Sequence, residues 1–392
     1  MKKITLLTLL FLNLALFSQS KEFVIVDANS NKPVDLAQIS YPTLATGSIS
    51  NEDGKIRIPL HKQNILVSHI NYVEKEYPFD IFYKKDTIFL VPKNIQLDEI
   101  IISNVDLKAK FSNILKKTYL SNYSTKRAIN KSTYKETFKI NDSLNRLFQV
   151  QLNWWSKEAL FKSGKAIHKQ NKIFLESVDY SKIKQTDASI LNANGAYIAN
   201  KDLFRVLHLN YWLEVLNNLT FDFNVKSIEK EKKAIKIYFD ATLIEKGKEI
   251  YYHKNSVIVF DENYNYIKYL KLNMFYNTKF EKGVSRLHKI PNEKKTTKHS
   301  VELSFKRLKN NKQILNYFIS EFEGIIKTKK YIDTVVSKQS IFISESLLDK
   351  KLKKENIDFY KPFFENLPTN LKNNDVKILL TKEEKGFLNS SN

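Results

Sequence analysis

The chain has 392 residues, of which 42% are apolar, and it contains no cysteine. This length predicts two or three domains, and the apolar fraction is enough for each to bury a core. The absence of cysteine excludes disulfides, zinc fingers, thiol nucleophiles and iron–sulfur centres. The 26 phenylalanines and 20 tyrosines, beside only 8 glycines, favour a fold that is mainly β.

The formal net charge of +22 raises the question of an acidic partner. Nearly all of the positive charge comes from lysines scattered along the chain. Arginine, which is suited to paired recognition of phosphates and bases, is rare. The sequence therefore predicts no nucleic-acid binding. Weak peripheral attraction to an anionic membrane or envelope surface fits the charge better.

The first twenty residues, MKKITLLTLLFLNLALFSQS, have the pattern of a secretory signal peptide. Lys2 and Lys3 precede an apolar stretch (4–17), and Ser18 and Ser20 suit the positions before a cleavage site. A membrane anchor is the alternative, but the stretch is short for a bilayer span. We predict that residues 1–20 are removed and that the mature protein is exported. It would then stay in the periplasm or at the periphery of the outer membrane, or be secreted.

Short alternating runs separated by turn formers fill residues 22–104. In KIRIPL, Ile56 and Ile58 alternate with Lys55 and Arg57, so that one face is apolar and the other is charged. The runs EFVIV, LAQISY, NILVSHINY, DTIFLV and LDEIIIS have a similar character. Strands at this spacing, with no helical period among them, predict a small β-sandwich.

The segment 51–54, NEDG, contains oxygen groups of the kind that bind calcium. A calcium loop needs several such ligands at regular spacing and a glutamate further on, but Lys55 and Arg57 follow here. Gly54 accepts the positive φ that a hairpin turn requires. We therefore predict a turn and no metal site, and we interpret the loop 27–31 in the same way.

Jointly, these residues resemble the carboxypeptidase regulatory-like domain that is common in exported proteins of Bacteroidetes. The matching positions are Val26-Asp27, Lys32-Pro33-Val34, Gly47, Asp53-Gly54, Leu66-Val67-Ser68 and Leu97-Asp98-Glu99-Ile100. The sequence departs from the family at Asn71, where glycine is usual, although asparagine tolerates the left-handed conformation. The resemblance implies a transthyretin-like, seven-stranded sandwich over about residues 22–104. It also implies that this domain is accessory and not catalytic.

The name of that family raises the question of a zinc peptidase. The stretch from His299 to Glu302 has the H-x-x-E ligand spacing, but no histidine follows it to complete the site. In the alternating run HSVELSFKRL, His299 and Glu302 also point to opposite faces of a strand, whereas zinc ligands must converge. We therefore predict no zinc site here.

Other catalytic patterns are missing from the sequence. It contains no G-x-S-x-G, no glycine-rich phosphate loop and no H-E-x-x-H. The remaining histidines are scattered, and we expect His208, in an apolar helical stretch, to pack in a core and not to act as a base. We predict no catalytic residue, metal or other cofactor. The alternative is an envelope hydrolase whose carboxylates are brought together only by the fold.

Residues 105–345 are predicted to form an antiparallel β-rich domain with helices near 105–121 and 201–218. The second helix is apolar over most of its circumference, which is typical of a helix buried on several sides. The alternating runs that follow it predict an antiparallel meander. We therefore expect an α+β domain with a curved antiparallel sheet packed on a helix. Residues 346–392, rich in lysine and asparagine, are predicted to be a polar C-terminal segment.

One run of this domain contains the candidate contact residue. Phe148, Val150, Leu152 and Trp154 alternate with polar residues and are expected to point inward. Trp155 breaks the alternation, because it lies on the polar face. A tryptophan exposed to solvent can hold a ligand or anchor a partner, and the alternative is that a neighbouring loop covers it.

In outline, the second domain is similar to periplasmic lipoprotein carriers of the LolA type, half-barrels whose concave side takes acyl chains, but no functional motif matches. We favour an exported, non-catalytic envelope protein that binds a partner protein or a glycan. The first alternative is a periplasmic carrier of a lipid or another apolar ligand, for which the four inward residues above would line a cavity. The second is the hydrolase. The oligomeric state is not predicted.

Overall fold

The structure is a computed structural model that describes residues 20–41, 46–93, 105–123, 127–184, 200–218, 220–231, 233–245, 248–284, 290–308, 310–368 and 378–390. Long strands dominate these residues and the helices are short, so the predicted mainly-β fold is confirmed. The predicted signal peptide, apart from Ser20, lies outside the described residues, and so does the predicted strand LDEIIIS.

The described residues divide into two compact units. The first comprises residues 20–93 and 378–385, and the second comprises residues 105–368 and 386–390. Each unit has its own buried apolar cluster. Each of them therefore has the anatomy of a domain.

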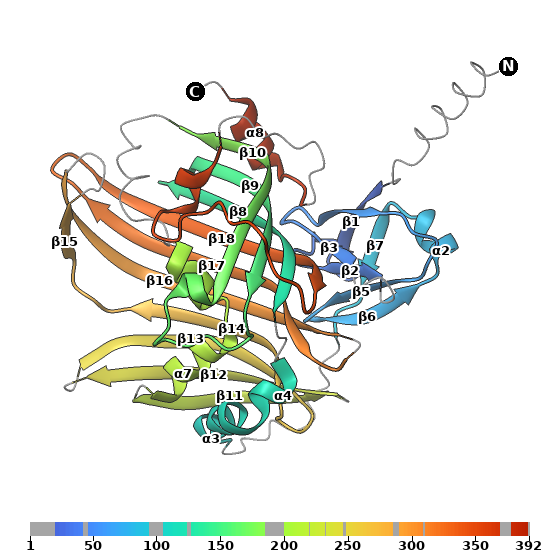
Figure 1. Ribbon diagram of the computed structural model, residues 1–392, viewed down its shortest axis with the longest axis horizontal. Coiled ribbons are helices and arrows are strands. Elements are labelled where there is room, and N and C mark those ends of the chain that lie inside the picture. The colour runs from blue at the N-terminus through green and yellow to red at the C-terminus, as the bar shows by residue number, and fades with distance from the viewer. Residues whose placement is uncertain are drawn as a thin grey trace. The chain divides into compact units, whose positions relative to one another are not determined.

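Two sheets make up the first unit (Figure 1). One sheet has the order β4 (Lys55–Pro59), β1 (Ser20–Asp27) and β7 (Thr87–Leu90). The other has the order β3 (Thr46–Ile49), β2 (Gln38–Tyr41), β5 (Ile65–His69) and β6 (Tyr72–Tyr77), and helix α2 (Phe79–Tyr83) lies between β6 and β7 in the sequence. Ile56 and Ile58 are buried in one cluster with apolar residues of both sheets, as the alternation predicts. Two sheets around one core form the β-sandwich expected here.

A turn is present at Asp53-Gly54, but the prediction of a hairpin is wrong, because β3 and β4 on either side of it belong to different sheets. Gly54 has a φ of 72°, and a Cβ at this position would collide with the carbonyl oxygen of Ile25. The Asn51 Oδ1 atom accepts hydrogen bonds from the backbone N–H groups of Asp53 at 3.1 Å and Lys55 at 2.9 Å. The asparagine oxygen thus stabilises the turn itself.

The same turn also binds the C-terminal segment of the first unit. The Asn51 side chain donates to the carbonyl oxygen of Leu379 at 2.9 Å. The Asp53 carboxylate accepts from the backbone N–H of Lys382 at 3.0 Å, at the first residue of helix α8 (Lys382–Asn389). A carboxylate at this position satisfies an N–H group that the helix itself leaves unpaired.

An eleven-stranded antiparallel sheet forms the framework of the second unit (Figure 1). In spatial order it contains β10 (Asn171–Ile183), β9 (Ser143–Ser156), β8 (Ala128–Ile140), β18 (Ile332–Leu347), β17 (Gln313–Lys327), β16 (Pro291–Arg307), β14 (Ile267–Tyr276), β13 (Lys248–Asp261), β12 (Ala234–Glu245) and β11 (Phe221–Glu231), and β15 (Glu281–Val284) pairs with β16. The β8–β9 hairpin turns at Asn141 and Asp142, which both have positive φ, as a type I′ turn requires.

The sheet curves around several short helices (Figure 1). The range predicted as the first helix contains α3 (Leu107–Asn113), a π-helical turn (Ile114–Thr118) and α4 (Tyr119–Tyr123). In place of the second predicted helix there are two, α6 (Asn200–Val206) and α7 (Leu209–Asn218), and short 3-10 turns occur at Ile167–Lys169 and Phe363–Asn366. No helix among the described residues has both the length and the apolar character needed to cross a membrane.

Helix α6 ends at Val206, although the sequence predicts one continuous helix, and side chains from the following residues contact its last carbonyl groups. The His208 Nδ1 atom lies 2.9 Å from the carbonyl oxygen of Phe204, and the Trp212 Nε1 atom donates to the carbonyl oxygen of Val206 at 2.8 Å. These carbonyl groups belong to the last turn of α6, where a helix has no N–H groups of its own to offer. The chain therefore turns near Leu207 without leaving them unsatisfied.

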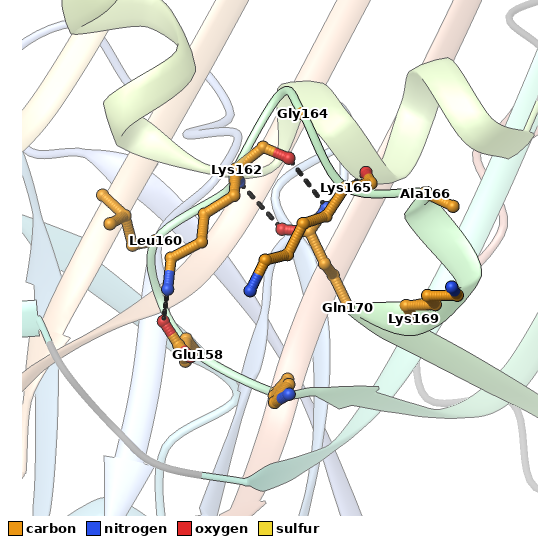
Figure 2. Close-up of a pocket in the computed structure, with 9 residues that line it drawn as sticks. Glu158, Leu160, Lys162, Gly164, Lys165, Ala166, Lys169 and Gln170 are labelled. Atoms are coloured by element: carbon orange, nitrogen blue, oxygen red, sulfur yellow. Dashed lines mark hydrogen bonds and ion pairs between the residues drawn. The ribbon is translucent and has the colours of Figure 1, made fainter.

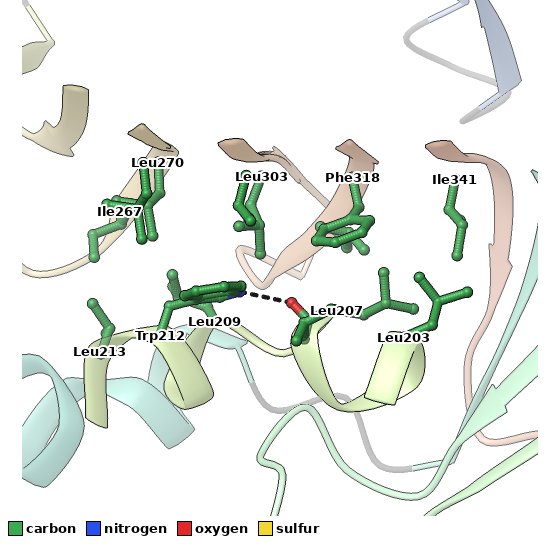
Figure 3. Close-up of a cluster of buried hydrophobic side chains, with 14 of the residues drawn as sticks. Leu203, Leu207, Leu209, Trp212, Leu213, Ile267, Leu270, Leu303, Phe318 and Ile341 are labelled. Carbon is green, nitrogen blue, oxygen red and sulfur yellow. Dashed lines mark hydrogen bonds between the residues drawn. The ribbon is translucent and has the colours of Figure 1, made fainter. Parts of the chain in front are cut away.

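The apolar sides of α6 and α7 face the inner side of the sheet (Figure 3). On the helix side the core contains Leu203, Leu207, Leu209, Trp212 and Leu213, and on the sheet side it contains Ile267, Leu270, Leu303, Phe318 and Ile341. Removing such side chains from water is the main favourable contribution to folding. The prediction of a curved sheet packed on an apolar helical segment is confirmed in this coarse form.

The prediction that residues 346–392 form a polar segment is wrong for residues 357–363. Ile357, Phe359 and Phe363 are buried in the core of the second unit. The Phe363 ring lies 6.0 Å from the Phe148 ring, centroid to centroid, and stacks on it. Because the lysines and asparagines around these residues dominate the composition, the sequence does not reveal their burial.

Candidate functional site

Trp155, the predicted contact residue, lies on β9 and is only 9% exposed. Its Nε1 atom donates to the carbonyl oxygen of Lys350 at 3.0 Å, just after the end of β18. This arrangement corresponds to the alternative in which a neighbouring loop covers the indole. Trp155 therefore offers little surface to a ligand or partner.

Trp155→Ala is expected to lower the free energy of unfolding by about 3 kcal/mol, because it removes a buried indole and leaves a cavity. The melting temperature of the variant, measured by circular dichroism, would test this. Trp155→Phe should lose less, because it keeps most of the buried area. An unchanged melting temperature for Trp155→Ala would contradict the buried role and return this side chain to the candidate contacts.

The carrier alternative predicts that four inward side chains of β9 line a cavity: Phe148, Val150, Leu152 and Trp154. This prediction is wrong, because all four belong to the packed core of the second unit. Trp154 lies 5.8 Å from the Phe204 ring and donates from Nε1 to Asn171 Oδ1 at 2.9 Å. The cavity beside Trp154 has a volume of only about 50 Å³. A cavity of this size is too small for an acyl chain.

His299 and Glu302 point to opposite faces of β16, as their spacing predicts. The His299 Nε2 atom lies 2.8 Å from Ser320 Oγ, and its ring faces Trp212 on the inner side of the sheet. The Glu302 Oε1 atom accepts a hydrogen bond from the Tyr317 hydroxyl at 2.7 Å on the outer side. The two side chains therefore cannot converge on one metal ion.

Three histidines of the second unit are removed from water. Burial lowers the pKa of His208, His253 and His299 to about 4, so each is neutral at pH 7. Neither ring nitrogen of His253 has a hydrogen-bond partner among the described residues. Its ring instead packs 5.2 Å from that of Phe221. His208 is a core residue, as predicted, and His253 has the same character.

No group of three or more histidine, aspartate or glutamate side chains in the described ranges is placed to hold a metal ion. The two most deeply buried charged side chains of the described residues form an ion pair.

This ion pair, Glu136 with Arg146, lies on the inner face of β8 and β9. The Arg146 Nε and Nη2 atoms both lie 2.7 Å from Glu136 Oε1, and the side chains are 0% and 2% exposed. The Tyr134 hydroxyl donates to Glu136 Oε2 at 2.7 Å. The guanidinium carbon lies 4.8 Å from the Phe138 ring centroid and 4.3 Å from that of Phe364. The cation is thus fully buried and contacts two aromatic rings and a carboxylate, which indicates a structural role.

A pocket of about 420 Å³, which we call the inner-face pocket, lies on the inner side of the sheet where β17 leads into β18. Five residues with apolar or minimal side chains and two tyrosines line part of it: Phe322, Gly324, Ile325, Ile326, Val335, Tyr251 and Tyr276. Polar and charged residues line the remainder: Thr278, Lys279, Glu281, Lys294, Lys295 and Thr296. It therefore combines apolar surface with cationic and hydrogen-bonding groups, as ligand sites do.

The tyrosines give the inner-face pocket an aromatic wall. Tyr251 and Tyr276 stack with ring centroids 5.4 Å apart and an angle of 23° between the ring planes. Burial raises the pKa of Tyr276 to about 12, so its hydroxyl is neutral at pH 7. A Cβ on Gly324 would lie 2.8 Å from the carbonyl oxygen of Lys295, so a larger residue there would displace the neighbouring strand. The glycine thus keeps this part of the pocket open.

Neither the ion pair nor the inner-face pocket was identified from the sequence. Arg146 has the same strand parity as Phe148, and this could have placed the arginine on the inner face. The pocket residues come from β13, β14, β16, β17, β18 and the chain around β15, so only the strand order brings them together.

No protein-family model and no curated protein matches this chain.

Proposed function

We propose that the protein is an exported, non-catalytic binding protein of the cell envelope. In this proposal the second unit binds a glycan through the inner-face pocket, and the first unit is an accessory β-sandwich. The signal-peptide pattern supports export, and the resemblance to carboxypeptidase regulatory-like domains supports the accessory role. One observation carries the proposal: aromatic rings and several cationic side chains meet in one open pocket of about 420 Å³.

The chemistry of the inner-face pocket suits a sugar ring. Aromatic rings have an apolar face and tyrosine adds a polar hydroxyl, so the stacked pair can pack against C–H groups and still donate a hydrogen bond. Lys279, Lys294 and Lys295 are donors without an acceptor lone pair, and they favour a hydroxyl-rich ligand that also bears carboxylate or another anionic group. We therefore expect an acidic glycan.

A photo-reactive residue in the pocket would test this proposal in the native compartment. Thr278 would be replaced by p-benzoylphenylalanine in the full chain with its own signal sequence, and the cells would be irradiated. We expect a cross-linked glycan whose mass remains on the peptide around position 278 after protease digestion and is lost after glycosidase or acid treatment. In the matched control, p-benzoylphenylalanine replaces Asn310, an exposed residue in the turn between β16 and β17. This variant should give no such adduct.

The adduct also distinguishes the glycan from a partner protein. A protease-sensitive adduct at Thr278 that is absent at Asn310 would contradict the glycan and assign the pocket to a segment of a partner protein. Equal adducts at both positions would contradict a specific site in the pocket.

A carrier of an apolar ligand is the second candidate. It is favoured by the four apolar side chains that line part of the pocket, Phe322, Ile325, Ile326 and Val335, which offer apolar surface to part of an acyl chain. Solvent extraction of protein purified from the envelope, followed by mass spectrometry, would test it. Lipid at a ratio near one to one would support the carrier, and Val335→Trp, which fills the pocket, should then abolish it.

A further inference from the structure

A second pocket, which we call the lysine-loop pocket, lies within the chain that connects β9 to β10 (Figure 2). Its volume is about 320 Å³, and all of its walls come from this connection. Four of the lining residues are lysines: Lys157, Lys162, Lys165 and Lys169. Glu158 is the only acidic residue among the residues that line this described pocket.

One buried side chain holds the loop in shape. The Gln170 amide nitrogen donates to the carbonyl oxygens of Lys162 at 3.0 Å and Lys165 at 2.8 Å (Figure 2). Its Oε1 atom accepts from the backbone N–H of Lys162 at 2.8 Å. A single amide thus closes the loop through three hydrogen bonds. Because the backbone is held, little ordering of the loop is required when a ligand arrives.

The core of the second unit holds the same loop from the other side. The Asn210 side chain on α7 accepts from the backbone N–H of Phe161 at 2.9 Å and donates to its carbonyl oxygen at 2.9 Å. Asn210 is fully buried. The lysines therefore project from a backbone that is fixed on both sides, unlike lysines on an exposed helix or strand.

The charges of the lysine-loop pocket act on a common region. Lys162 and Lys165 extend to the same side of the loop, toward Glu158 (Figure 2). The Lys162 Nζ atom lies 2.8 Å from Glu158 Oε2. The hydrogen bond from Lys162 holds the pKa of Glu158 below its usual range, and the charges of Lys157 and Lys165 act in the same direction. One carboxylate thus faces several ammonium groups and neutralises only one of them.

We propose that the lysine-loop pocket binds a compact phosphate group, as a free phosphorylated molecule or as a headgroup phosphate at a membrane surface. Four lysines and one glutamate line the pocket, so its excess of positive charge is best matched by an anion with more than one negative charge. Lysine ammonium groups act as point charges around a compact anion, whereas a planar carboxylate is better matched by arginine. Glu158 forms an ion pair with Lys162, so an incoming phosphate competes with this carboxylate.

Calorimetric titration of the mature protein with pyrophosphate and with inorganic phosphate would test the site. The titration is done at about 150 mM salt, where attraction by distant surface charges is screened. We expect Lys157→Gln/Lys165→Gln to weaken pyrophosphate binding about tenfold, and Lys62→Gln/Lys230→Gln, which removes the same charge from exposed positions elsewhere, to leave it within about twofold. Absence of pyrophosphate and vesicle binding, or equal losses in both double variants, would overturn the proposal.

Two further variants separate a built site from general charge attraction. Glu158→Gln removes the competing carboxylate and should strengthen pyrophosphate binding by roughly threefold or more. Gln170→Ala keeps the net charge but breaks the three hydrogen bonds that close the loop, and it should weaken binding about tenfold if the loop geometry matters. Unchanged binding in Gln170→Ala would overturn a preformed pocket.

Vesicles distinguish the two sources of phosphate. We would compare sedimentation with phosphatidylcholine vesicles that contain or lack phosphatidylglycerol, for the parent chain and both lysine double variants. Binding that needs phosphatidylglycerol and is lost only in Lys157→Gln/Lys165→Gln would assign the pocket to a headgroup. Pyrophosphate binding without vesicle binding would assign it to a free phosphorylated molecule.

Discussion

Acidification from pH 7 to pH 5 is expected to lower the free energy of unfolding of the second unit by about 6 kcal/mol, which is about 2 kcal/mol for each of His208, His253 and His299. Burial lowers the pKa of all three to about 4 in the folded chain, whereas the usual value is 6.5. Below pH 6.5 the unfolded state therefore binds protons that the folded state does not. The contribution of these neutral histidines to the free energy of unfolding is therefore present above pH 6.5 and is lost as the pH falls toward 4.

Urea unfolding at pH 7, 6 and 5, followed by tryptophan fluorescence, would measure this loss, because all three tryptophans of the chain lie in the second unit. His253→Phe removes one of the three groups and should reduce the loss by about one third. His168→Phe is the matched control, since His168 is exposed, and should leave the loss unchanged. Equal stability of the parent chain at pH 7 and pH 5 would contradict the prediction.

Glu136→Leu is expected to lower the free energy of unfolding by about 3–5 kcal/mol, because it leaves the Arg146 charge buried without its carboxylate. The same unfolding titration would measure the effect. Glu345→Leu is the matched control: Glu345 lies 2.8 Å from Lys131, but both side chains are more than one third exposed. Its loss should stay below about 1 kcal/mol. Similar losses in the two variants would contradict a special role of the buried pair.

The double variant Glu136→Leu/Arg146→Met extends this test. It replaces both charges by apolar side chains, so no unpaired charge remains in the core. It should be more stable than either single variant, although it still loses the hydrogen bond from Tyr134. If the losses of unfolding free energy in Glu136→Leu and Arg146→Met add up to the loss in the double variant, the two side chains do not act as a pair.

The strands could be predicted from the sequence because their signal is local. The alternation of Ile56 and Ile58 in the first unit, and of Phe148 and Val150 in the second, directly reflects one buried face. The end of α6 could not be predicted. The apolar pattern continues through Leu207, and the change depends on which carbonyl groups the side chains of the next turn reach.

The candidate sites were less predictable than the strands, for two physical reasons. Strand parity places Trp155 on a polar face, but parity does not show that the chain at Lys350 covers that face. The lysine-loop pocket depends on Gln170, whose three hydrogen bonds lie within an irregular loop. A glutamine in such a loop has no distinguishing pattern, and its role appears only when the backbone path is known.

The pairing of β8 with β18 has a consequence for how the second unit is made. Ile129 pairs with Leu347, so the hairpin that begins the sheet is joined to the last of its long strands. During synthesis β8 has an unpaired edge until nearly the whole unit has been made. Contacts between residues so distant in sequence slow folding, and an open strand edge can pair with another chain in the meantime. We therefore expect the nascent chain to need protection from aggregation, and truncations before β18 to aggregate and not to fold partially.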